Sequence, residues 1–158
     1  NQKDAKQDSI KNFCKKIKKA KETKISNDFL IIARIESLIL GKSNSDALKR
    51  AEAYSKAGAD AILIHSKEKY PKEIFNFAKR FKKSRYFKPL VAVPSSYSKT
   101  YEKDLARNGF KVVIYANHLM RASYPAMVHA AKTILMKKRS YELEDKISSI
   151  KEIINLIK

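Results

Sequence analysis

The chain has 158 residues, of which 44% are hydrophobic, and it contains three glycines and four prolines. This composition excludes a disordered or low-complexity chain and allows one ordinary domain or part of a larger one. The formal charge of +19 is compatible with a nucleic-acid partner, but the lysines are spread along the chain and no nucleic-acid-binding motif lies among them. We interpret the lysines as solvated helix faces, and a basic nucleic-acid-binding domain stays as the non-enzyme alternative.

The sequence offers no sign of export or membrane insertion. No run of about 18 apolar residues occurs, and the polar start of the chain lacks the apolar core of a signal peptide. We therefore expect a cytoplasmic protein without a membrane partner. The single cysteine, Cys14, falls on a helical apolar spacing, which predicts a buried packing role.

The first predicted element is an amphipathic helix over residues 8–21, because apolar residues recur there at helical spacing with lysines opposite. Residues 29–34 form a nearly continuous apolar run after the turn-forming Ser26-Asn27-Asp28, which predicts a parallel strand covered on both faces. A helix follows, which Ser43-Asn44-Ser45 can cap and which Gly58 ends.

The same order of strand and helix then repeats along the chain. Short apolar runs predict strands over residues 61–65, 90–93 and 111–115. A helix is predicted after each of these strands. The first begins at Pro71, the second begins at Ser98 and ends at Gly109, and the third begins at Ser123 and Pro125.

This alternation predicts an α/β fold with a parallel sheet and right-handed crossovers. Four strands with their helices make half of a TIM-type (β/α)8 barrel or a small open doubly wound sheet, and periodicity alone leaves both open. No glycine-rich dinucleotide fingerprint follows any strand, which weakens the doubly wound alternative. The final segment, residues 144–158, carries an isoleucine stripe too apolar to be left in water, so we expect it to pack on this barrel or on a neighbour.

Polar side chains end two of these strands, and the loops after strands are where reactive groups gather in parallel α/β folds. Arg34 and Glu36 are two residues apart, so an extended backbone points both to one face. The guanidinium matches carboxylate or phosphoryl oxygens and the glutamate can orient it, although a structural ion pair is an equal alternative. His65 ends the next strand, where an imidazole can donate to an anion or transfer a proton, or serve only structure. His118 and His129 are weaker candidates.

Four stretches, in order, carry a family resemblance. They are Asp28-Phe-Leu-Ile-Ile-Ala-Arg-Ile-Glu36, Asp46-Ala-Leu-Lys-Arg-Ala-Glu-Ala-Tyr54 continuing into Ala57-Gly-Ala-Asp-Ala-Ile-Leu-Ile-His-Ser-Lys67, Tyr115-Ala-Asn-His-Leu-Met-Arg-Ala-Ser123, and Glu144-Asp-Lys-Ile-Ser-Ser-Ile-Lys-Glu152. Together they resemble the phosphoenolpyruvate mutase branch of the isocitrate lyase superfamily over nearly the whole chain.

The resemblance implies an eight-stranded barrel, of which residues 1–158 supply about the last four strand-helix units and residues 144–158 a terminal helix exchanged within a homo-oligomer. It implies that Arg34 and His65 are catalytic and hold the phosphoryl group of the substrate, with Glu36 an acid near the metal site. The family's Mg2+ ligands and mobile gating loop lie upstream of the matched region. We therefore expect Mg2+ as cofactor, no metal ligand in this segment, and no activity from this segment alone.

The function that the resemblance implies is phosphoenolpyruvate phosphomutase activity. Such an enzyme interconverts the small molecules phosphoenolpyruvate and phosphonopyruvate, the entry step to phosphonate synthesis. The residue that separates the mutase from phosphonopyruvate hydrolase belongs to the gating loop, so hydrolysis stays an alternative. Carbon-carbon lyase cleavage of a 2-methylisocitrate-like or oxaloacetate-like acid is the other enzymic alternative.

Overall fold

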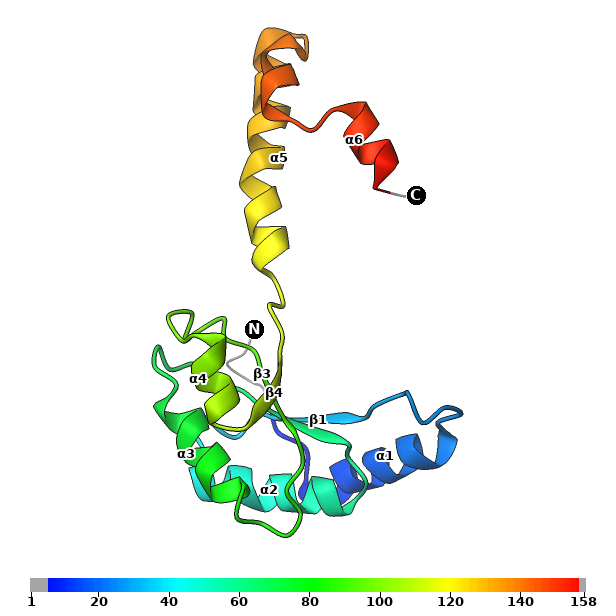
Figure 1. The fold of residues 1–158 in the computed structure, drawn as a ribbon, viewed down its shortest axis with the longest axis vertical. Helices are drawn as coiled ribbons and strands as arrows, with labels where there is room; N and C mark the ends of the chain where they lie inside the picture. The colour runs from blue at the N-terminus through cyan, green and yellow to red at the C-terminus, as the bar shows by residue number, and fades with distance from the viewer. Residues whose placement is uncertain (1–5, 157–158) are drawn as a thin grey trace. The chain divides into compact units, whose positions relative to one another are not determined.

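The computed structural model describes residues 6–156, and the chain divides into two compact units, Asn1–Ala116 and Asn117–Lys158. Helices and strands alternate in the first unit (Figure 1). In chain order they are α1 (Ile10–Thr23), β1 (Ile32–Ile35), α2 (Asn44–Lys56), β2 (Ala61–Ile64), α3 (Lys72–Phe81), β3 (Leu90–Ala92), α4 (Glu102–Arg107) and β4 (Phe110–Val113).

The strands form one parallel sheet in the order β1-β2-β3-β4, which confirms the predicted α/β fold. In its first pair, Arg34 lies opposite Leu63 and Ile35 lies opposite Ile64. Because paired strands are neighbours in the sequence and run the same way, their carboxyl ends lie at one edge of the sheet.

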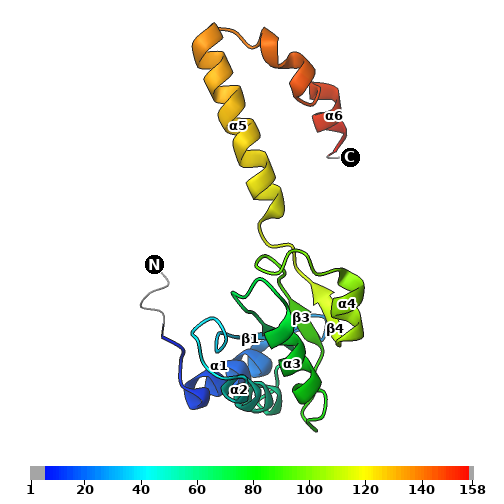
Figure 2. The same cartoon turned by 90° about the vertical axis from the view of Figure 1, so that its left-hand side faces the viewer.

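One face of the sheet packs against the helices. The core on this face joins residues from all four strands and all four helices of the first unit, among them Ile17, Ile35, Ala51, Ile62, Phe77, Ala92, Leu105 and Phe110. Figures 1 and 2 show α1, α2 and α3 side by side along that face. A parallel sheet with helices on this face is the coarser fold that both sequence alternatives share, and the barrel stays a prediction.

A second, smaller apolar cluster lies on the opposite face of the sheet. Ala61, Leu63, Val91 and Val93 pack together there, with exposed fractions of 8% or less. Ile32 on β1 is nevertheless 41% exposed, so within the described residues this strand is covered on one face, and its coverage on the second face stays a prediction. The helices of the first unit cover the side of Ala33 and Ile35, which are 2% and 0% exposed.

The start of the first strand was also predicted too early. Phe29 and Leu30 are 62% and 61% exposed, and the strand begins at Ile32. Before it, Ile31 is tied to Asp60 by two hydrogen bonds, from the Ile31 N–H to the carboxylate and from the Asp60 N–H to the Ile31 carbonyl. The apolar run therefore predicted the strand but not the residue at which it begins. The other three strands lie within one or two residues of their predicted bounds.

Helix boundaries follow local capping chemistry. The hydroxyl of Ser9 accepts the Asn12 N–H at 3.1 Å to begin α1, and that of Ser43 accepts the Asp46 N–H at 3.2 Å to begin α2. Gly58 follows α2 with φ at 113°, a backbone angle that a side chain would strain, and so ends the helix as predicted.

Two predicted helix starts were wrong. Ser98 does not cap α4, because the Thr100 N–H donates to the Tyr97 carbonyl in a turn and the helix begins only at Glu102. Ser123 and Pro125 do not open the long helix α5 (His118–Lys137), which begins before them. Pro125 lies inside that helix and Ser123 donates its hydroxyl proton to the Met120 carbonyl.

The second unit contains α5, a short 3-10 helix η2 (Tyr141–Lys146) and α6 (Ile150–Asn155). Ser149 and Glu152 form a reciprocal capping box at the start of α6. Ile147, Ile150, Ile153 and Ile154 are 50 to 80% exposed in this chain, and Ile157 lies outside the described residues. Their burial against a barrel, and the assignment of residues 1–158 to one half-barrel domain, stay predictions.

Within residues 6–156, no helix is long and apolar enough to cross a membrane.

A matched pair of substitutions tests the helix-side core. Phe77→Ala removes a fully buried ring that stacks on Phe81 with centroids 5.5 Å apart, so we expect the free energy of unfolding to fall by about 3 to 5 kcal/mol. Phe29→Ala removes the same atoms from an exposed position and should cost less than about 0.5 kcal/mol. Urea unfolding monitored by circular dichroism measures both. Equal losses would contradict the assignment of this core.

Candidate active site

Arg34 and Glu36 lie at the carboxyl end of β1. Within this strand the buried residues Ala33 and Ile35 alternate with exposed ones, so the side chain of Arg34 leaves the sheet on the face opposite the helices. The Nε of Arg34 donates to Oε1 of Glu36, and the two side chains are 51% and 34% exposed. The glutamate therefore holds one edge of the guanidinium while solvent still reaches the rest.

His65 follows β2 directly. Since Ile35 pairs with Ile64, the residues that come next, Glu36 and His65, leave neighbouring strands at the same level. His65 is two residues after Leu63, which pairs with Arg34, so strand alternation puts these side chains on one face. The structure thus brings all three predicted site residues, Arg34, Glu36 and His65, to one edge of the sheet.

The protonation of His65 is set by its surroundings. Burial lowers the pKa of His65 below its ordinary value of 6.5, the positive charge of Arg34 lowers it further, and the carboxylate of Glu36 acts in the opposite direction. Its Nδ1 is buried and makes no hydrogen bond within the described residues. At neutral pH the imidazole is therefore neutral, with one nitrogen able to donate and one able to accept.

Tyr97 is a neighbour of the site that sequence reasoning missed. Its ring centroid lies 6.5 Å from that of His65, and the side chain is fully buried. Burial raises the pKa of Tyr97 to about 12, so the hydroxyl keeps its proton. A tyrosine in a serine-rich loop carries no sequence signal for this placement.

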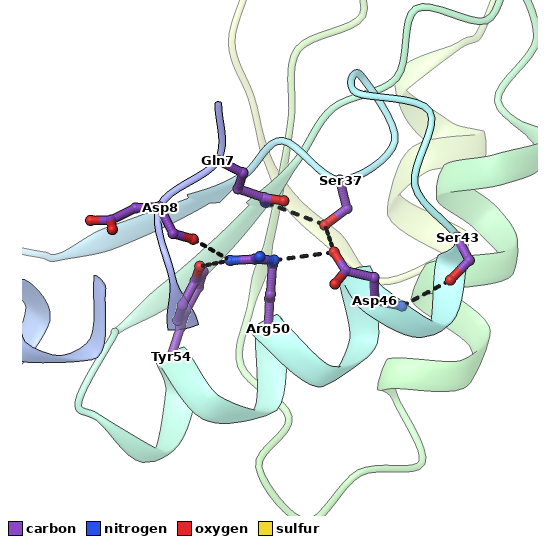
Figure 3. A network of polar contacts seen from close by, with 7 residues as sticks. All are labelled: Gln7, Asp8, Ser37, Ser43, Asp46, Arg50 and Tyr54. Atoms are coloured by element: carbon purple, nitrogen blue, oxygen red, sulfur yellow. Dashed lines mark hydrogen bonds and ion pairs between the residues drawn. The ribbon is translucent and has the colours of Figure 1, made fainter. Parts of the chain in front are cut away.

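A polar network connects the turn after β1 with helix α2 (Figure 3). Ser37, the residue after Glu36, donates to Oδ2 of Asp46 at 2.7 Å, and Nε of Arg50 reaches the same oxygen at 3.1 Å. Nη1 of Arg50 also donates to the hydroxyl of Tyr54 at 3.0 Å. The i,i+4 spacing of Asp46 and Arg50 is readable in the sequence as a helix ion pair, but its link to Ser37 is not.

The loops after β2 and β3 border a cavity of about 280 Å3 at the same edge of the sheet. Its lining residues are Lys69, Tyr70, Ser96, Ser98 and Lys99. Arg34 and His65 are not among them, so a single pocket shared by these two residues stays a prediction.

The described residues do not by themselves make a metal site. Among residues 6–156 no group of three histidine, cysteine, aspartate or glutamate side chains is arranged to hold a metal ion. Glu36 is the carboxylate beside Arg34, and its ion pair with that residue uses one of its oxygens. A hard cation such as Mg2+ needs several oxygen ligands, which this site does not supply.

The sequence matches a family model described as phosphoenolpyruvate phosphomutase over residues 1–135. The chain belongs to this family. A phosphoenolpyruvate phosphomutase of Tetrahymena pyriformis is 41% identical over 147 residues, which are 93% of this chain and 48% of the relative. The chain thus spans about half the length of the curated relatives it matches.

Solved structures of the family agree with the fold. The crystal structure of a phosphoenolpyruvate phosphomutase from Streptomyces platensis subsp. rosaceus matches with a TM-score of 0.85 and 38% identity, over 94% of this chain and 50% of that one. A phosphonopyruvate hydrolase in complex with oxalate and Mg2+ matches with a TM-score of 0.84 and 39% identity, over 94% and 52%. Mutase and hydrolase are therefore similarly close to this chain.

The electrostatics of the site can be checked by titration. His65 should titrate below 6.5; Arg34→Gln removes a positive charge and should raise the pKa of His65, whereas Glu36→Gln removes a negative charge and should lower it. Proton NMR of the imidazole C2–H against pH measures each value, with His65→Gln to assign the resonance. Arg107→Gln, which removes an exposed arginine paired with Asp104, should leave the His65 curve unchanged. Identical curves in all variants would contradict the arrangement.

Proposed function

We propose that this chain supplies the second half of a (β/α)8 barrel that interconverts phosphoenolpyruvate and phosphonopyruvate, the entry step to phosphonate synthesis. The observation that carries the proposal is the meeting of Arg34, Glu36 and His65 at the carboxyl ends of two adjacent parallel strands, on the face opposite the helices of the first unit. Family membership over residues 1–135 and 41% identity to a relative of that name support it.

In the proposed reaction the phosphoryl group moves between the enol oxygen and C3 of pyruvate. Its equatorial oxygens carry the charge during transfer, so the protein mainly orients and stabilises. Arg34 binds these oxygens through the guanidinium N–H groups that do not contact Glu36, and Glu36 fixes the plane of the guanidinium. His65 is neutral because burial lowers its pKa, and the neutral imidazole donates its one N–H to the same group.

We propose Mg2+ as the cofactor, with ligands outside residues 6–156. The family's hydrolase structure with oxalate and Mg2+ supports this proposal. When bound, the ion would supply a Lewis acid for the enolate oxygens. The residues of this chain would then bind and orient the phosphoryl end of the substrate, which is a separate task.

Phosphonopyruvate hydrolysis is the second candidate, because a hydrolase of 39% identity has the same fold over 94% of the chain. Both reactions need a site for the phosphoryl group, so Arg34 and His65 do not separate them. Phosphorus NMR of phosphonopyruvate incubated with the complete natural polypeptide does. The mutase produces the phosphoenolpyruvate signal, whereas the hydrolase produces inorganic phosphate and pyruvate.

The role of Arg34 is tested by kinetics in the complete natural polypeptide that carries these residues. Arg34→Ala should cost about 3 to 4 kcal/mol in transition-state stabilisation, on the order of a hundredfold to a thousandfold in rate. Arg34→Lys should recover only part of this loss, because an ammonium cannot contact Glu36 and the substrate with a planar fork. His65→Ala should also lower turnover without unfolding the protein.

The matched control for these variants is Arg107→Ala, which removes an exposed arginine of the same unit and should leave turnover unchanged. Steady-state kinetics with phosphonopyruvate and thermal melts are measured for every variant. Near-normal turnover in Arg34→Ala and His65→Ala would overturn the proposed roles. A large fall in melting temperature in Arg34→Ala would favour the structural ion pair instead.

We further propose that residues 144–158 pack on a partner subunit of a homo-oligomer. The isoleucines of α6 and of the segment before it support this. Their side chains are 50 to 80% exposed, and a contiguous apolar patch on a helix is rarely left in water. Helix exchange between identical chains buries such a face at little cost.

Ile150→Ser with Ile154→Ser should therefore convert the complete natural polypeptide from an oligomer to a monomer, since it removes two apolar side chains from one helix face. Lys151→Ser lies on the same helix and should leave the assembly intact. Light scattering after size-exclusion chromatography measures the mass of each. An unchanged mass in the double variant would count against the exchanged helix.

A further inference from the structure

Two fully buried serines directly follow two residues of the site. Ser37 follows Glu36 and Ser66 follows His65, and each serine is 0% exposed. A buried hydroxyl without a partner is costly, so its hydrogen bonds matter for the local backbone. Since β1 and β2 pair with Ile35 opposite Ile64, the two serines occupy equivalent places, two residues beyond each end of the pairing.

Each serine donates to a carboxylate on the next helix along the chain. Ser37 Oγ lies 2.7 Å from Asp46 Oδ2, and Ser66 Oγ lies 2.6 Å from Glu73 Oε2. Asp46 is in the first turn of α2 and Glu73 in the first turn of α3, where a helix stabilises negative charge. Hydrogen bonds to a carboxylate are the stronger kind.

These two serine–carboxylate pairs are themselves held in place. Arg50, 6% exposed, binds Asp46 Oδ2 with Nε at 3.1 Å and reaches the Asp8 carbonyl with Nη1 at 2.9 Å (Figure 3). Burial alone would raise the pKa of Asp46, but the hydrogen bonds from Ser37 and Arg50 lower it, so the carboxylate stays ionised. The amide of Asn44 donates to the backbone carbonyl of Glu73 at 3.0 Å and so links the first turns of α2 and α3.

The serines face away from the site residues that they follow. Ser37 begins the turn after β1 and Ser66 lies just beyond β2, and both buried hydroxyls donate to carboxylates of the helix layer. Each serine shares a planar peptide unit with the residue before it, so fixing the serine restricts the backbone from which the preceding side chain leaves. A serine bound to the helix layer therefore sets where the preceding side chain points.

We propose that Ser37 and Ser66 are positioning residues that act with Asp46 and Glu73 to hold Glu36 and His65 in place at the strand ends. This rests on the proposed function for what the site binds, but the positioning itself does not depend on which phosphoryl reaction occurs. Catalytic groups displaced by about 1 Å lose on the order of a hundredfold in rate.

The test combines a titration with kinetics. In Ser66→Ala the imidazole gains freedom to reach solvent, so the pKa of His65, read from its C2–H proton by NMR, should rise toward 6.5. In the complete natural polypeptide, Ser66→Ala and Ser37→Ala should each lower kcat for phosphonopyruvate about tenfold or more, with a smaller change in KM. Ser55→Ala is the matched control, since Ser55 is a buried serine of α2 with no hydroxyl partner in the described chain.

A second pair of variants avoids any packing defect at the serines. Glu73→Gln keeps an oxygen that can accept from Ser66 and should retain the His65 pKa and most of kcat, whereas Glu73→Ala should reproduce Ser66→Ala. The proposal would be overturned if Ser37→Ala and Ser66→Ala lowered the melting temperature but kept the same His65 pKa and kcat as the control Ser55→Ala. If wild type turns over no phosphonopyruvate, the proposed function fails, and the His65 titration still decides whether the serine positions the imidazole.

Discussion

The parallel pairing of β1 with β2, in the register that puts Ile35 opposite Ile64, is the constraint on which the candidate site depends. It makes Glu36 and His65 equivalent residues of neighbouring strands and puts Arg34 on their face. A slip of one residue would turn Arg34 toward the helix core and Ile35 away from it. Burial of Ala33 and Ile35, at 2% and 0% exposure, therefore fixes the register and the site together.

The two faces of the sheet have different tasks. The helix-side face carries the continuous core that stabilises the first unit, and it anchors the strand ends through Ser37 and Ser66. The other face carries a small cluster around Leu63 and Val91, with Ile32 still 41% exposed. Proposed closure into a barrel would cover that apolar face with further strands, and it agrees with relatives about twice as long as this chain.

Sequence reasoning predicted what depends on local pattern and failed where distant contacts decide. The runs before His65 and around Val91 marked strands because both faces there are buried, but Phe29 belongs to an equally apolar run and is exposed. Pro125 looked like a helix start, yet α5 continues through it. The positions of Arg34, Glu36 and His65 at the strand ends were predictable because each ends or follows an apolar run, whereas their roles stay predictions. The contact of Ser37 was not predictable, because its hydroxyl bonds to the Asp46 carboxylate nine residues away and nothing in the local sequence indicates that contact.

The charge of the site is more modest than the +19 of the chain suggests. His65 is neutral at neutral pH, and Glu36 compensates Arg34, so the three side chains together carry no net charge. In the proposed function, these three side chains would therefore bind a phosphoryl dianion through directed hydrogen bonds rather than through net charge. Glu36 contacts Nε of Arg34, which leaves the two Nη groups of the planar fork for two oxygens of the proposed phosphoryl ligand. The ion pair with Glu36 thus lowers the long-range attraction of Arg34 for an anion but fixes the orientation of its guanidinium, and the proposed phosphoryl transfer would depend on that orientation.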